Sequence, residues 1–229
     1  MPQSIRPIFR WIAVGLATAF VLAKLAQFVA VTFLGEPAHV DPGMAAYERG
    51  EFEKAYRNWL PLAEGGSAPA QASIAAMYLR GEGVETDFAK AKELAMQAAE
   101  KNNPDAQFIL GWLADFGKAD PENNAEAAIW YRNAAAQGHT RAQYNVGLLY
   151  LEGEGVPNEI NQALYWFNMA AESEYPDAQF ALGLIYQDGM GVPVDLDMAL
   201  QWYQRAADNG HLLAQQGVMV VTMQKSDSN

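Results

Sequence analysis

The sequence has no cysteine among its 229 residues. That absence excludes disulfide bonds, iron–sulfur ligation and thiolate zinc sites. It does not identify the compartment, because proteins of oxidising spaces can also lack cysteine. We therefore expect no metal or cofactor that depends on a thiolate, and nothing else in the sequence predicts a cofactor of another kind.

Basic residues are also scarce. No lysine or arginine lies between Ala142 and Gln204, where nine acidic residues fall. Residues 1–35 carry three basic side chains and no acid, so the remaining chain carries −15 against the total of −12. A body this acidic should repel nucleic acid and anionic lipid. Two interpretations stay open, a cationic partner or a solubilising surface.

A long apolar run occupies residues 11–34 near the N-terminus. Roughly 20 apolar residues cross the hydrocarbon core of a bilayer, so the run predicts one transmembrane helix. Arg6 and Arg10 precede it and Glu36 follows, which predicts a cytoplasmic N-terminus. In a bacterium the acidic body would then lie in the periplasm, tethered to the inner membrane. The alternative is a cleaved signal peptide and a secreted periplasmic adaptor, although no small-x-small cleavage site follows promptly.

The apolar run also contains a possible contact surface for another membrane helix. Lys24 lies near its middle, which costs roughly 2.5–3.5 kcal/mol on insertion, and Gln27 shares its side. Small residues at four-residue spacing run beside them and would let a second helix approach closely. The predicted membrane-helix contact comprises Gly15, Ala19, Ala23, Lys24, Gln27 and Ala30. The alternative is a lone anchor in which the lysine reaches toward the interface.

The rest of the chain is an internal repeat. The dipeptide Ala-Gln recurs at a constant interval of 36 residues, at Ala70, Ala106, Ala142, Ala178 and Ala214. Each period contains two helical patterns separated by a glycine loop, such as Gly81–Val84, which provides the positive φ that ends a helix. One helix pair cannot bury its apolar face alone, but stacked pairs can. The sequence predicts an all-α protein, a right-handed α-solenoid of stacked helix pairs preceded by one transmembrane helix.

The register predicts the organisation of the whole chain. The expected segments are a cytoplasmic tail (1–10), the transmembrane helix (11–34), a linker (35–43), N-terminal capping helices (44–69), four repeats (70–105, 106–141, 142–177, 178–213), a C-terminal capping helix (214–223) and a disordered tail (224–229).

The repeated columns resemble the Sel1-like repeat family, a branch of the tetratricopeptide-like helical repeats. Residues 142–177 carry the pattern most closely, in Ala142, Val146-Gly147, Tyr150, Gly153-x-Gly155-Val156, Ala163, Trp166-Phe167 and Ala170-Ala171. The second repeat departs from it, with Gly117, Ala119 and Asp120 in place of Gly-x-Gly-Val, so its loop should be reshaped. The resemblance implies an adaptor or scaffold of a macromolecular complex, often at a membrane or cell envelope. Some cysteine-rich relatives have been linked to β-lactam binding, but this chain lacks the cysteines they share.

Residues that could carry chemistry are few. His139 and His211 follow glycines two periods apart, where we interpret them as turn residues rather than a metal pair. No histidine has a serine or cysteine near it in register, so a catalytic triad is unsupported. A cell-wall-active or β-lactam-binding enzyme would need a cluster of perturbed acids in a pocket, and the sequence shows none. We expect no catalytic, cofactor-binding or metal-binding residues and no small-molecule substrate.

An apolar column on the first helices is the predicted partner-binding groove. Its i, i+4 pairs lie at matching repeat positions: Phe108 and Trp112, Tyr144 and Leu148, Phe180 and Leu184. The alternative is that this column only packs on the second helices. The preferred function is a non-catalytic scaffold or assembly subunit of a membrane or envelope complex, whose protein partners bind the concave face, the transmembrane helix or both. An accessory subunit held mainly by its membrane helix is the other possibility.

Overall fold

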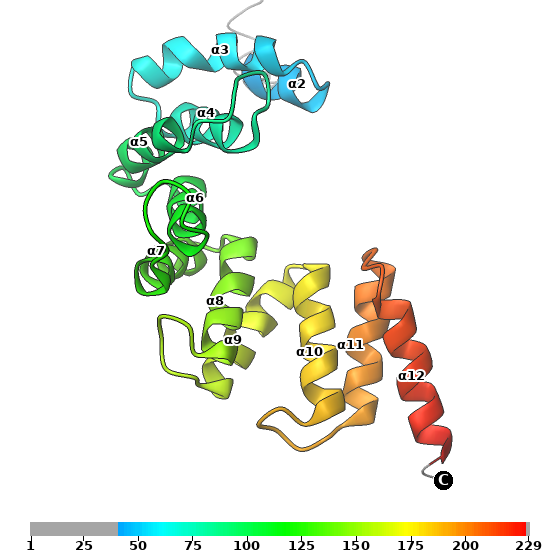
Figure 1. Ribbon diagram of the computed structural model, residues 1–229. Coiled ribbons are helices and arrows are strands. Elements are labelled where there is room, and N and C mark those ends of the chain that lie inside the picture. Colours follow the sequence, from blue (N-terminus) through cyan, green and yellow to red (C-terminus); the bar gives the residue numbers. More distant parts are fainter. Residues whose placement is uncertain (1–40, 228–229) are drawn as a thin grey trace, which may run out of the picture.

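The computed structural model describes residues 41–227, which form eleven helices and no strand (Figure 1). Their bounds are α2 Pro42–Glu48, α3 Phe52–Glu64, α4 Ala68–Arg80, α5 Phe88–Ala99, α6 Pro104–Asp115, α7 Asn124–Ala136, α8 Thr140–Glu152, α9 Ile160–Glu172, α10 Pro176–Asp188, α11 Leu196–Asp208 and α12 Ala214–Asp227. The all-helical class and the pairing of helices are confirmed.

The helix pairs stack into a curved array. The first helices of the repeats are α4, α6, α8 and α10, and each packs against the second helix that follows it, α5, α7, α9 or α11. The first helices α4 and α6 also touch each other, as do α10 and α12, whereas the second helices of neighbouring repeats make no comparable contact within residues 41–227. The first helices therefore line the inner, concave side of the arc in Figure 1. The right-handed sense of the solenoid stays a prediction.

Glycine loops end the first helices as expected. Gly81, Gly153 and Gly189 adopt φ of 72°, 77° and 68° directly after α4, α8 and α10, a conformation that costs glycine little. The second repeat differs, because α6 is capped by Phe116 at φ −96° and Gly117 follows at +56°. The reshaped loop predicted for this repeat is thus present.

The second glycine of each Gly-x-Gly loop has a different role. A Cβ on Gly155 would lie 2.2 Å from the carbonyl oxygen of Asn124, and one on Gly83 would lie 2.6 Å from the backbone of Phe52. Both partners stand at the start of the preceding second helix. The glycine therefore lets each loop pack directly on its neighbour along the stack, a contact between repeats that pattern alone does not reveal.

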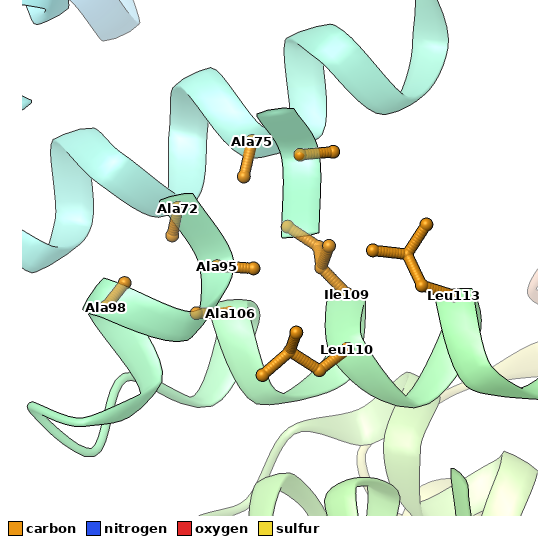
Figure 2. Packing of buried hydrophobic residues seen from close by; sticks show 9 residues of the cluster. Ala72, Ala75, Ala95, Ala98, Ala106, Ile109, Leu110 and Leu113 are labelled. Atoms are coloured by element: carbon orange, nitrogen blue, oxygen red, sulfur yellow. The ribbon is translucent and has the colours of Figure 1, made fainter. Parts of the chain in front are cut away.

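The centre of each helix pair is a glycine against an aromatic ring. A Cβ placed on Gly111, Gly147 or Gly183 would lie 2.5–2.6 Å from the ring of Tyr131, Phe167 or Tyr203, respectively. Repeat 1 has alanine at both matching positions, and Figure 2 shows Ala75 and Ala95 among the small side chains of this core. Two alanines in repeat 1 thus fill about the same space as a glycine and an aromatic ring in the later repeats.

The Ala-Gln dipeptide joins successive repeats. Four of the five glutamines are buried, and Gln215 is exposed. The side-chain amides of Gln71, Gln143 and Gln179 donate to the backbone carbonyls of residues 63, 135 and 171, at 3.1, 3.3 and 3.1 Å, whereas that of Gln107 donates to the Asn102 side chain. These carbonyls lie near the end of the preceding second helix, and each also accepts a backbone amide, from Gly66, Gly138 and Glu174, respectively. The glutamine column therefore adds a hydrogen bond from one repeat to the end of the repeat before it.

Both ends of the chain differ from the predicted boundaries. Pro42 and Gly43, assigned to a linker, begin α2, where Asp41 caps the helix and accepts a bond from the Trp59 indole at 2.9 Å. At the other end α12 continues to Asp227, four residues past the predicted Met223, and Lys225 in this extension pairs with Asp197 on α11.

The predicted cytoplasmic tail 1–10, the transmembrane helix 11–34 and residues 35–40 of the linker lie outside the described residues. Between residues 41 and 227 no helix combines the length and apolarity that crossing a membrane requires.

Candidate interaction surface

The six predicted groove residues lie on the first helices α6, α8 and α10 and are all half-buried. Their rings contact the second helices, with Phe108 5.7 Å from Tyr131 and Tyr144 5.7 Å from Phe167 between ring centroids. Each nevertheless keeps part of its surface exposed. The column thus packs on the second helices and also contributes to the surface. Neither a pure binding groove nor pure packing on the second helices, the two interpretations of the sequence, describes it alone.

The turns between repeats add three more rings to this column. His139 stacks on Phe108 with centroids 4.6 Å apart, and His211 stacks on Phe180 at 4.1 Å. Tyr175, at the equivalent turn, lies 5.4 Å from Tyr144. We call the set Phe108, His139, Tyr144, Tyr175, Phe180 and His211 the ring row. It lines three consecutive repeat junctions with aromatic surface, which is suited to apolar and cationic groups.

His139 is a structural residue whose proton position follows from its bonds. Its Nδ1 accepts from the Ala142 amide at 3.1 Å and so caps α8, which leaves the proton on Nε2. Nε2 faces the Asp105 carboxylate at 3.4 Å. This hydrogen bond holds the pKa of Asp105 below its usual value. The interpretation of His139 as a turn residue agrees with this geometry.

Where the ring row should begin, the surface is hollow. Repeat 1 has Ala72 where the later repeats have Phe108, Tyr144 and Phe180. It has Ala76 where they have Trp112, Leu148 and Leu184. Both alanines line a cavity of about 360 Å³, which we call the N-terminal pocket. The sequence did not predict this pocket, because the prediction rested on the large apolar residues of the column and not on the two positions of repeat 1 where alanine replaces them.

The walls of the N-terminal pocket come from five elements. Met44 and Tyr47 of α2 and Trp59 of α3 line it together with Ala72 and Ala76 of α4. Phe108 of α6 and His139, which both belong to the ring row, line it as well. Its charged lining residues are Arg80, Asp105 and Arg141. The Arg80 guanidinium donates to the Tyr47 hydroxyl at 2.8 Å and lies 3.3 Å from the Glu82 carboxylate. Within residues 41–227 the Arg141 side chain makes no hydrogen bond or ion pair.

Signs of catalysis are few in the described part. Among residues 41–227 no three histidine, aspartate or glutamate side chains are placed to hold a metal. Burial raises the pKa of Asp115, whose carboxylate accepts from the Tyr131 hydroxyl at 3.2 Å. The same burial raises the pKa of Tyr131 well above its usual value. This pair lies at the end of α6, away from the N-terminal pocket, and we interpret it as a satisfied core contact.

Sequence comparison identifies the repeat. A profile described as the Sel1 repeat matches residues 68–103, 104–139, 140–175 and 176–211. The chain belongs to the Sel1 repeat family. Its matched segments have the predicted 36-residue period and begin two residues earlier than our register. Proteins built from Sel1 repeats act as protein-interaction scaffolds.

Solved structures of Sel1 repeat proteins agree in fold. A Sel1 repeat protein from Oxalobacter formigenes is 38% identical with a TM-score of 0.65, and the match covers 74% of this chain and 50% of the other. A protective antigen of uropathogenic Escherichia coli strains is 29% identical with a TM-score of 0.66, over 76% and 38%. In Arabidopsis thaliana, the ERAD-associated E3 ubiquitin-protein ligase component HRD3A is 35% identical over 69 residues, 30% of this chain and 10% of that protein. The chain thus spans half or less of each of these relatives.

Proposed function

We propose that this Sel1 repeat protein is a non-catalytic scaffold or assembly subunit that binds a segment of a partner protein along the ring row. The observation that carries the proposal is the partly exposed aromatic surface that continues across three repeat junctions on the first helices. Aromatic side chains provide large contact area at a low cost in conformational entropy, and they dominate interface energetics. Because no basic residue lies between Ala142 and Gln204, the part of the partner over repeats 3 and 4 should be basic.

The proposal includes a membrane tether. The apolar run 11–34, with Arg6 and Arg10 before it, supports a single-pass anchor in a bacterial inner membrane, with a cytoplasmic N-terminus and periplasmic repeats. The partner would then belong to a membrane or envelope complex, and Lys24 with the small residues beside it would offer a second contact within the bilayer.

The ring row is tested by purifying the full-length protein in mild detergent with whatever binds it, and identifying those proteins by mass spectrometry. Tyr144→Ala, in the ring row, should reduce recovery of the partner at least about tenfold, as expected for loss of an interface aromatic. Tyr165→Ala is the matched control, because Tyr165 is a 55% exposed tyrosine on the second helix α9. Equal recovery with both variants would place binding elsewhere than on the ring row.

A separate variant tests the tether. Lys24→Leu should leave Tyr144-dependent recovery intact but release any partner held through the membrane helix. Should Lys24→Leu change nothing while Tyr144→Ala abolishes recovery, the concave face alone would be the binding surface.

A further inference from the structure

The N-terminal pocket exists because two side chains of the column are absent. Ala72 and Ala76 stand where the later repeats place a phenylalanine or tyrosine and a tryptophan or leucine. Phe108, at the next position of the column, borders the space that results. A volume of about 360 Å³ is within the range of ligand-binding sites and fits one or two amino-acid residues. The concave face therefore offers aromatic surface over three junctions and then a hollow.

The charge of this hollow differs from that of the rest of the body. Arg80 and Arg141 line it with one lining acid, Asp105, and Glu82 pairs with Arg80 beside it, whereas residues 36–229 together carry −15. The Arg80 side chain is 45% exposed and is oriented by Tyr47 and Glu82. Arg141 has no ion-pair partner among residues 41–227 and projects from the start of α8. Two guanidinium groups beside an apolar floor are suited to a carboxylate attached to an apolar group.

The lining of the pocket favours a chain end. A peptide lying along the ring row reaches the pocket at Phe108 and then meets α2 and α3, whose Tyr47 and Trp59 also line it. A segment that ends there places its terminal carboxylate beside the two lining arginines, Arg80 and Arg141. The Asp105 carboxylate, 70% of whose side chain is exposed, keeps room to accept the last main-chain N–H of such a segment.

We propose that the N-terminal pocket binds the carboxy-terminal residue of a partner protein. The apolar side chain of that residue lies over Ala72 and Ala76, and its terminal carboxylate lies between the Arg80 and Arg141 guanidinium groups. The inference rests on the proposed function, since the rest of the partner segment would follow the ring row.

The test offers the purified full-length protein in detergent a pool of acetylated pentapeptides randomised at the last three positions. The pool is supplied once as free acids and once as carboxy-terminal amides, and retained peptides are identified by mass spectrometry. Retained peptides should be free acids with an apolar last residue. Affinity measured by fluorescence anisotropy for the best peptide should fall at least about tenfold for its amide, because a charge-assisted hydrogen bond is lost.

Three variants locate the binding. Arg141→Gln should weaken the best peptide on the order of tenfold, whereas Arg132→Gln, an exposed arginine on the second helix α7, should change nothing. Ala72→Phe restores the ring of the other repeats and should abolish binding, with far-UV circular dichroism confirming that the helices are retained. Equal retention of acids and amides, no retention of either, or an unchanged affinity in Arg141→Gln would overturn the proposal.

Two further outcomes separate this proposal from others. Free phenylalanine or leucine binding as tightly as the peptide would indicate a small-molecule site and would contradict a partner terminus. Loss of the copurified partner in Tyr144→Ala without any effect of Arg141→Gln would refute the pocket inference and leave the ring row standing. The reverse result would refute the ring row and leave the pocket.

Discussion

The contact between Gly147 and Phe167 provides a quantitative test of how each repeat is packed. A Cβ on Gly147 would lie 2.6 Å from the Phe167 ring, a distance that real Cβ contacts do not show. Gly147→Ala should therefore force the ring or the helix to move, at about 1–3 kcal/mol for overpacking. Replacing glycine by alanine inside a helix returns about 0.5–1 kcal/mol. The net change should be a loss of about 1–2 kcal/mol in the free energy of unfolding.

Removing the ring should reverse the sign of that substitution. Phe167 is completely buried, so Phe167→Ala should cost about 3–5 kcal/mol. On that background the added methyl group enters space the ring has left, and only the helix preference of alanine remains. The double variant Gly147→Ala, Phe167→Ala should then be more stable than Phe167→Ala alone, as in repeat 1, where Ala75 faces Ala95. The coupling energy should be about 2 kcal/mol, well above the roughly 0.3–0.5 kcal/mol error of additivity.

The assay is urea-induced unfolding followed by far-UV circular dichroism and by tryptophan fluorescence. Two probes are needed because stacked repeats can unfold in parts, and only coincident transitions justify a single free energy. If Gly147→Ala has the same effect with and without the Phe167 ring, the two residues are not coupled. The conclusion that a ring at this position requires glycine opposite it would then be wrong.

Three further substitutions test separate features. Gln143→Leu should cost about 0.5–1.5 kcal/mol in urea unfolding, because it removes the hydrogen bond to the carbonyl of residue 135, which keeps the Gly138 amide as a donor; a neutral result would show that the glutamine column does not join the repeats. Glu174 has φ of 60°, so Glu174→Gly should raise the unfolding free energy by about 0.5–1 kcal/mol, whereas Glu172→Gly, at the end of α9, should lower it. The pKa of Asp105 is lowered in the folded protein, so its ionised carboxylate stabilises the fold. This contribution to the free energy of unfolding is present above the usual pKa near 3.8 and is lost as the pH falls through the lowered pKa. Asp105→Asn should therefore be less stable than the parent chain at pH 5 by under about 1 kcal/mol, given its exposure, and the difference should vanish at low pH; a constant difference would show that the His139 contact is not its origin.

The sequence by itself determined the period, the helical class and most helix ends. These properties are local or periodic: Gly81, Gly153 and Gly189 end their helices because glycine adopts positive φ without strain, and Pro104 and Pro176 begin theirs because the first turn needs no amide donor. Stacking the columns on a 36-residue interval also selected the six predicted groove residues. The four-residue spacing within each pair follows from helical geometry alone.

Only the tertiary structure decided what those columns do. Whether Tyr144 is core or surface depends on Phe167 and Tyr175, which come from a different helix and a different turn. The partnership of glycine with a ring, and its replacement by Ala75 and Ala95 in repeat 1, appears only when the two helices are packed together. The N-terminal pocket is the clearest case. Ala72 reads in sequence as an ordinary helical alanine, and it becomes the floor of a cavity because neighbours 30 or more residues away along the chain, Phe108 and Arg141 among them, define the space it leaves empty.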